Sequence, residues 1–216
     1  MNNKNSALIL IDIQNDFLPG GALAVTDGDR ILSPVTDLAR MFGTIVLTQD
    51  WHPADHKSFA SNHDGAAPFS LTEMPYGPQV LWPDHCVQGT GGADFRLPAD
   101  VEQRAALIIR KGINPEIDSY SAFTENDHVT STGLSGWLRE RGVERVVLAG
   151  LALDYCVAYS ALDAAEAGFE VDVVLEACRA IGADTAAAQV SAMRDAGVRV
   201  WETVLDLAED GQGLRP

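Results

Sequence analysis

Short runs of consecutive apolar residues recur along this chain, and segments with apolar residues every three or four positions lie between them. The short runs are rich in β-branched residues and are apolar throughout. Strands with one solvent-exposed face instead alternate between apolar and polar residues. Continuous apolar runs are typical of parallel strands that are buried on both faces. They predict six strands, over residues 7–11, 44–48, 106–109, 145–149, 171–175 and 198–201.

The intervening segments have the spacing of amphipathic helices. This spacing predicts helices over residues 29–41, 134–141, 154–167 and 184–196. Gly142, Gly168 and Gly197 stand where the last three should stop, and Asp184 stands where an N-cap would lie. Alternating strands and helices predict an α/β fold of three layers, α/β/α, around a six-stranded, mostly parallel sheet.

One stretch, residues 51–105, lacks this rhythm and is rich in Pro, Gly, His and Trp. It holds four of the five histidines, His52, His56, His63 and His85. A loop of this length inside a compact domain is usually functional. A chain of 216 residues is one domain by the usual length prior. We therefore expect one domain over residues 1–216 with an active-site loop region over 51–105.

The charge balance narrows the classes of partner. Lys and Arg total 15 and Asp and Glu total 31, a net charge of −16. Such a surface repels phosphate backbones and anionic lipid, which argues against binding to nucleic acid or to a membrane. Three cysteines without a C-x-x-C motif, and a first apolar run too short for a signal peptide, favour a cytoplasmic protein. A small molecule is the expected partner, and a homo-oligomer stays open.

Reactive residues follow the predicted strands. Asp12 follows the first strand, Asp50 the second and Lys111 the third, and Cys156 opens the helix after the fourth. Ligands of open parallel sheets bind outside the carboxyl ends of the strands, so these side chains should meet at one edge. A cysteine, a carboxylate and an ammonium there form a candidate nucleophile, base and positive charge.

Each of these residues also has a structural reading. Cys156 falls in the first turn of a predicted helix, where free N–H groups and the helix dipole favour thiolate and hold an oxyanion, but a buried core cysteine is the alternative. Asp12 is placed to act as a base, or to cap the turn that follows it. Lys111 is either part of the site or a solvated charge at a strand end.

A metal site is the second candidate. Asp50 and His52 flank one residue, so in extended chain their side chains share a side, and His85 lies in a Trp-Pro-Asp-His-Cys segment. One carboxylate and two imidazoles suit Zn²⁺, Fe²⁺ or Mn²⁺ with positions left open. The alternative is a set of loop histidines that bond to the backbone.

Five segments carry a family resemblance. They are Leu10–Phe17 (LIDIQNDF), Thr48–Pro53 (TQDWHP), Trp82–Thr90 (WPDHCVQGT), Lys111–Gly112 with Asp118–Phe123 (DSYSAF), and Gly150–Val157 (GLALDYCV). In these segments, and over nearly its whole length, the chain resembles the nicotinamidase branch of the isochorismatase-like cysteine hydrolases. The Asp-Trp-His and Trp-Pro-x-His-Cys segments separate that branch from metal-free relatives.

The resemblance implies an isochorismatase-like fold and hydrolysis of nicotinamide, and of pyrazinamide as well, to the acid and ammonia, in NAD salvage. It implies one divalent metal ion that holds the ring nitrogen of the substrate, and a cis peptide before Ala152. The roles it implies are: catalytic, Asp12, Lys111 and Cys156; metal ligands, Asp50, His52 and His85; ring contacts, Phe17 and Trp82; oxyanion hole, the N–H groups of Ala152 and Cys156. His56 matches a position that reaches the metal in some members only.

Two alternatives stay open. The first is a hydrolase of the same fold that acts on another small amide or a vinyl ether, and the metal motif argues against it. The second is a non-catalytic binding domain, which the presence of Asp12, Lys111 and Cys156 argues against.

Overall fold

The computed structural model describes residues 5–210 and contains the predicted sheet. Its strand order is β5-β2-β1-β6-β7-β8, and every neighbouring pair is parallel. The three-layer α/β prediction is therefore confirmed. The strands are β1 (Ser6–Ile11), β2 (Ile45–Asp50), β5 (Leu107–Lys111), β6 (Arg145–Leu151), β7 (Glu170–Arg179) and β8 (Arg199–Trp201).

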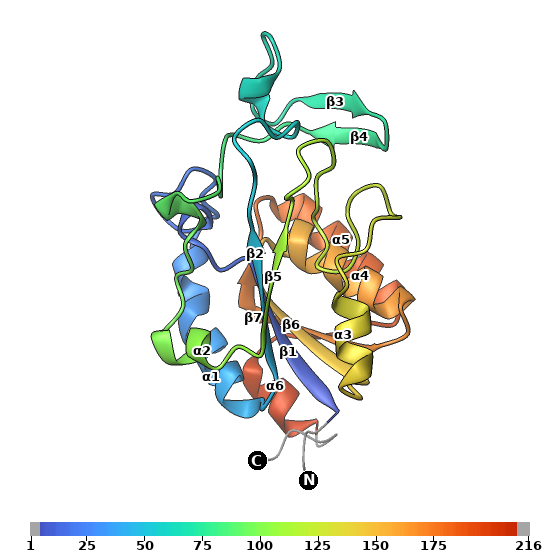
Figure 1. The fold of residues 1–216 in the computed structure, drawn as a ribbon. Helices are drawn as coiled ribbons and strands as arrows, with labels where there is room; N and C mark the ends of the chain where they lie inside the picture. The colour runs from blue at the N-terminus through green and yellow to red at the C-terminus, as the bar shows by residue number, and fades with distance from the viewer. Residues whose placement is uncertain (1–4, 211–216) are drawn as a thin grey trace.

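Helices cover both faces of the sheet (Figure 1). On one face lie α1 (Leu32–Met41) and α6 (Val204–Glu209), and on the other lie α3 (Leu134–Glu140), α4 (Ala158–Glu166) and α5 (Ala183–Asp195). The pattern did not predict α6 or α2 (Ala99–Gln103), which are too short to show a helical period. Among residues 5–210, no helix has the length and apolar character needed to cross a bilayer.

The predicted N-cap of α5 was wrong. Asp184 lies inside the first turn, and the N-cap is Gly182, whose backbone is extended. The carboxylate of Asp154, from the turn that carries Cys156, accepts hydrogen bonds from the N–H groups of Ile181 and Gly182 at 3.0 Å each. A residue distant in sequence therefore sets the start of this helix, which no local pattern could reveal.

The 51–105 region is not wholly irregular. It contains a hairpin of β3 (Leu71–Met74) and β4 (Gly77–Val80), which projects beyond the carboxyl ends of the sheet strands (Figure 1). The expectation of a long loop is corrected to this extent. The hairpin strands are only four residues each and mostly exposed or half-buried, so no continuous apolar run marks them.

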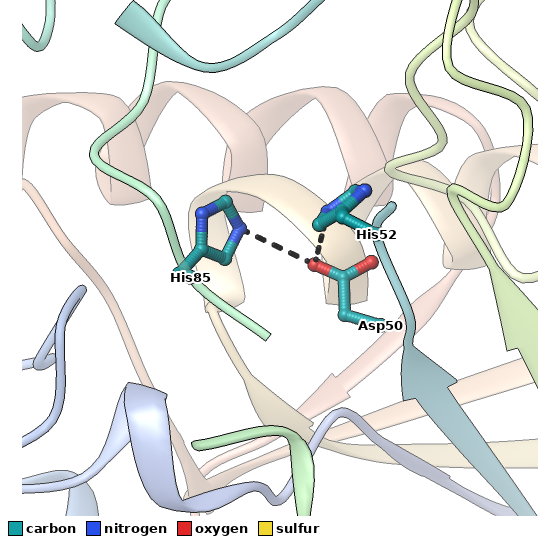
Figure 2. A group of neighbouring side chains, drawn as sticks. All are labelled: Asp50, His52 and His85. Carbon is teal, nitrogen blue, oxygen red and sulfur yellow. Dashed lines mark ion pairs between the residues drawn. The ribbon is translucent and has the colours of Figure 1, made fainter. Parts of the chain in front are cut away.

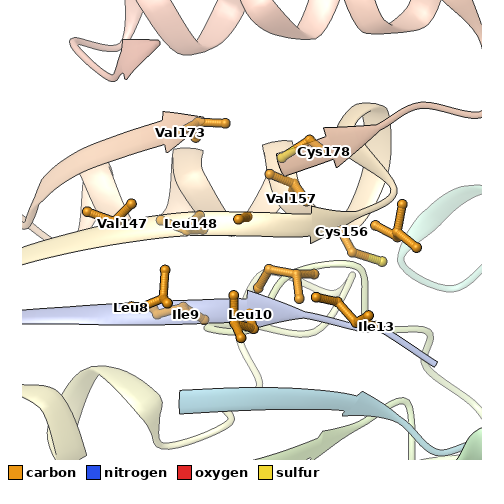
Figure 3. Packing of buried hydrophobic residues seen from close by; sticks show 14 of the residues in the cluster. Leu8, Ile9, Leu10, Ile13, Val147, Leu148, Cys156, Val157, Val173 and Cys178 are labelled. Carbon is orange, nitrogen blue, oxygen red and sulfur yellow. The ribbon is translucent and has the colours of Figure 1, made fainter. Parts of the chain in front are cut away.

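The core surrounds the central strand, β1, all six residues of which are buried. Leu8, Ile9 and Leu10 of β1 pack beside Val147 and Leu148 of β6 (Figure 3). This burial on both faces explains why the strand is continuously apolar. It also makes the end of the strand a rigid place from which to present a polar side chain.

The chain reverses direction across the sheet between β1 and β6. From β1 it proceeds to β2 and β5, and then returns to β6 on the other side of β1. Ile11 pairs with Gly150 at the ends of the two strands, and a Cβ on Gly150 would lie 2.1 Å from the Ile11 carbonyl oxygen. Only glycine allows this approach. Such a reversal is where open α/β sheets bind ligands, so Asp12 and Cys156 leave the sheet at the expected place.

Candidate active site

Asp12, Lys111 and Cys156 meet at the reversal point, as predicted. The Lys111 ammonium lies 2.8 Å from Asp12 Oδ2 and 3.5 Å from Cys156 Sγ, and it donates to the carbonyl oxygen of Ser119 at 2.9 Å. Lys111 is 2% exposed, so it is not the solvated strand-end charge of the alternative reading, and Asp12 beside it is 0% exposed. Asp12 Oδ1 accepts from Thr48 Oγ1 at 2.6 Å, which fixes the carboxylate.

A single π-helical turn, Leu153–Val157, carries Cys156 and leads into α4. The peptide bond before Ala152 is cis, as the resemblance implied. Ser160 Oγ donates to the Cys156 carbonyl oxygen at 2.6 Å and accepts from the Ala122 N–H at 2.8 Å, so the turn is tied to the neighbouring loop. The backbone that presents the thiol is therefore held from both sides.

Burial and charge set the protonation of this cluster. Burial raises the pKa of Asp12, and Lys111 only partly offsets this. Burial also raises the pKa of the Cys156 thiol well above its usual value, although Lys111 lowers it. Burial acts to lower the pKa of Lys111, but Asp12 and Asp50 outweigh it and raise that pKa. Burial therefore favours the neutral thiol and increases the proton affinity of Asp12, and it opposes the effect of the helix start, which was expected to favour thiolate.

The predicted metal ligands converge on one point. Asp50 Oδ2 lies 3.2 Å from His52 Nε2 and 3.4 Å from His85 Nε2 (Figure 2). The three ligand atoms lie within 4.8 Å of one another, and all three residues are buried. Burial raises the pKa of Asp50, but Lys111 and His52 outweigh it, and the pKa falls well below its usual value. Asp50 is therefore an anion.

A hydrogen bond between Nδ1 and a backbone carbonyl orients the ring of each histidine. His52 Nδ1 bonds to the Gly112 carbonyl oxygen at 3.0 Å, and His85 Nδ1 bonds to the Pro83 carbonyl oxygen at 2.8 Å. A carbonyl only accepts, so each Nδ1 carries a proton, which leaves each Nε2 as the ring nitrogen that would ligate a metal ion. A Cβ on Gly112 would lie 2.3 Å from the His52 ring, which explains glycine there. The donor set and its outer partners fit a divalent metal ion.

Asp50 joins the two clusters. Its Oδ2 faces the histidines, while its Oδ1 accepts from Lys111 Nζ at 2.6 Å. The register of the sheet makes this contact, because Asp50 and Lys111 are paired residues of β2 and β5. The nucleophile and the metal ligands are thus two ends of one hydrogen-bonded system.

His56 lies beside these ligands but in another group. Its ring contacts that of His52, with the centroids 4.4 Å apart, and its Nδ1 bonds to Ser58 Oγ at 2.7 Å. Together with His52 and Asp118 it forms a second set of ligand atoms within 4.8 Å. The structure therefore does not place His56 with Asp50 and His85.

A pocket opens onto both clusters through Cys156, Asp50 and His85. All four residues predicted to contact substrate line it. Its wall is mainly apolar with a few polar groups, which is typical of a site for a small molecule. The lining residues are Phe17, Leu23, Asp50, Trp82, His85, Asp118, Tyr120, Ala152, Tyr155, Cys156 and Ile181.

Five of these lining residues were not predicted: Leu23, Asp118, Tyr120, Tyr155 and Ile181. Tyr120 and Tyr155 pack edge-to-face against Trp82, with centroids 6.1 and 4.9 Å from it. Ile181 follows the end of β7 at Arg179, but the sequence predicted that strand to end at residue 175, so the strand-end rule that found Asp12 missed Ile181. Leu23 carries no such signal, because it enters from an irregular loop.

Comparison with known proteins agrees with this geometry. Residues 6–204 match the isochorismatase domain family. A nicotinamidase from Acinetobacter baylyi is 55% identical over 178 residues, which span 82% of this chain and 83% of that protein. The structure of a nicotinamidase/pyrazinamidase from Acinetobacter baumanii superposes with a TM-score of 0.92 at 48% identity, over 96% of this chain and all of that one (100%). A Pyrococcus horikoshii pyrazinamidase in complex with zinc has a TM-score of 0.73 at 37% identity, over 91% and 98% of the two chains.

Proposed function

Because this chain belongs to the isochorismatase family, we propose that it is a metal-dependent cysteine amidohydrolase that converts nicotinamide and water to nicotinate and ammonia. The observation that carries the proposal is the Asp12–Lys111–Cys156 cluster beside Asp50, His52 and His85, with Cys156, Asp50 and His85 lining one pocket. The three relatives described above are a nicotinamidase, a nicotinamidase/pyrazinamidase and a pyrazinamidase. The apolar wall and the polar groups of Asp50 and His85 suit a small heteroaromatic amide.

Asp12 begins the reaction. Its raised proton affinity lets it take the proton of the Cys156 thiol as the sulfur attacks the amide carbon. Lys111 stands between the two residues and stabilises the thiolate character that develops on sulfur. The N–H groups of Ala152 and Cys156 hold the oxygen of the tetrahedral intermediate.

The first half of the reaction ends when this tetrahedral intermediate collapses. Asp12 returns its proton to the amide nitrogen, the carbon–nitrogen bond breaks and ammonia leaves, which creates a thioester on Cys156. Asp12 then takes a proton from a water molecule that attacks the thioester carbon. The carbon–sulfur bond breaks, Asp12 returns its proton to the sulfur and the starting cluster is restored. The acid leaves as nicotinate, and its own proton is taken up by the released ammonia.

Asp50, His52 and His85 would hold the divalent ion, and zinc is our choice because a related pyrazinamidase binds it. When bound, such an ion is a Lewis acid that a pyridine nitrogen can ligate. Phe17 and Trp82 line the pocket and would contact the two faces of the ring, while Tyr155 packs edge-to-face against Trp82. These contacts set the amide carbon above the sulfur and supply the orientation that the reaction needs.

Ammonia release from nicotinamide by the purified, zinc-loaded protein tests the proposal. Benzamide is the matched control, since it has the same ring shape and amide but lacks the ring nitrogen, and pyrazinamide tests whether a second ring nitrogen is accepted. We expect turnover of nicotinamide and pyrazinamide and little of benzamide. Equal turnover of benzamide would refute the role of the ring nitrogen, and turnover of none of the three would refute the proposed substrate class.

A further inference from the structure

The first strand ends before the second one does, and this leaves a gap at the active-site edge of the sheet. Pairing of β1 with β2 runs from Leu8–Ile45 to Leu10–Leu47, while β2 continues to Asp50. The Trp51 N–H donates to the Lys111 carbonyl oxygen on the β5 side. Because successive residues of a strand face opposite neighbours, Asp50 turns its own N–H and carbonyl towards the missing part of β1.

The side chain of Gln14 fills this gap. Its Oε1 accepts from the Asp50 N–H at 2.8 Å, and its Nε2 donates to the Asp50 carbonyl oxygen at 2.8 Å and to the Ala93 carbonyl oxygen at 2.9 Å. Gln14 is 0% exposed, and its two donor hydrogens and its acceptor oxygen all have partners. The primary amide thus replaces a neighbouring strand at one residue.

We propose that Gln14 is a positioning residue that fixes Asp50 for the metal ion and for Lys111. Asp50 contacts both histidines and the lysine, so a shift of its backbone would disturb the ligand set and the nucleophile together. A primary amide presents two donor hydrogens and an acceptor oxygen side by side in this way. A carboxylate at position 14 would face two carbonyl oxygens with no proton to share.

Gln49 is a built-in control. Its Nε2 donates to the same Ala93 carbonyl oxygen at 3.0 Å, and its Oε1 accepts from Arg110 Nε at 3.0 Å. Gln49 is also buried, at 6% exposed. It therefore matches Gln14 in type, burial and one partner, but it makes none of the hydrogen bonds that hold Asp50.

The experiment measures zinc affinity on metal-free protein by competition with a coloured chelator. Outer-shell partners of metal ligands usually contribute a factor of about 10–100 to affinity. We expect Gln14→Glu and Gln14→Leu to weaken zinc binding by about this factor, with Gln49→Leu unchanged from wild type. At saturating zinc, the Gln14 variants should also show a lower kcat with little change in KM, because Asp50 holds Lys111 as well.

Three results would overturn the inference: unchanged zinc affinity in both Gln14 variants, an equal loss in Gln49→Leu, or unfolding of both Gln14 variants while Gln49→Leu folds. The last would make Gln14 a requirement of the fold and not of the ligand set. The inference rests on the proposed function, but the zinc measurement contains no substrate. Failure of the proposed substrate would therefore leave this result unchanged.

Discussion

Replacing Lys111 by Met removes the positive charge of the site while keeping its length and apolar stem. The ammonium lies 3.5 Å from Cys156 Sγ in a fully buried cluster. At that distance, and at an effective dielectric constant of about 20, attraction between an ammonium and a thiolate is about 5 kcal/mol. If that attraction is used mainly in the transition state, kcat falls by roughly three to four orders of magnitude, with little change in KM.

Lys111→Met should also lower the stability of the fold, by an amount that depends on pH. It leaves Asp12 and Asp50 as buried carboxylates without their shared cation, which costs about 3–5 kcal/mol. Burial already raises the pKa of Asp12 and Lys111 opposes it, so Lys111→Met raises this pKa further. A carboxyl whose folded pKa is raised destabilises the fold when ionised. The deficit in Tm should therefore be largest at neutral pH and shrink as the pH falls through the raised pKa towards the unfolded value of about 3.9.

The assay is the rate of Cys156 alkylation against pH, in zinc-loaded wild type and Lys111→Met. Burial raises the pKa of the thiol and Lys111 lowers it, so the apparent pKa should be higher in the Met variant. Lys111→Arg should not restore kcat, because a planar guanidinium cannot occupy the space between Asp12, Asp50 and the Ser119 carbonyl. Identical alkylation profiles in wild type and Lys111→Met would refute the tuning role and leave the lysine only a part in holding the two carboxylates.

Further substitutions test the other parts of the site. Cys156→Ala should abolish turnover but retain nicotinamide binding, as measured by calorimetry. Rapid quenching of the wild type with excess substrate should trap a thioester. Turnover by the Ala variant would exclude Cys156 as the nucleophile. Chelation should inactivate the enzyme reversibly, with activity restored by one zinc ion per chain; full activity in protein shown by metal analysis to contain no ion would refute the metal requirement. Asp154→Ala should release Ile181 and the start of α5 from the nucleophile turn, because it removes the 3.0 Å hydrogen bonds to Ile181 and Gly182. We expect it to lower Tm by several degrees and raise KM, and an unchanged KM would show that Ile181 does not shape the cavity.

The fold could be predicted because its strands are buried on both faces. All six predicted strands are present within one or two residues at their starts, and β7 extends further, to Arg179. What the pattern missed is short or exposed: α2, α6 and the β3–β4 hairpin, in which Gln79 is the one fully buried residue. Such segments are held by contacts with distant loops, as when Gln79 Nε2 donates to Asp118 Oδ2 at 2.8 Å. No local periodicity encodes a contact of this kind.

The features of the site likewise divide into those that the sequence could predict and those that depend on contacts between distant segments. Asp12, Asp50, Lys111 and Cys156 could be found because each stands at or just after the carboxyl end of a strand, and the topology of a parallel sheet brings those ends together. How they interact depends on register, which is a property of strand pairs. A shift of one residue between β2 and β5 would turn Lys111 to the opposite face from Asp50 and separate the nucleophile from the metal ligands. The early end of β1 is likewise what gives Gln14 its partners, so an ordinary glutamine in the sequence becomes a component of the site only through the length of a neighbouring strand.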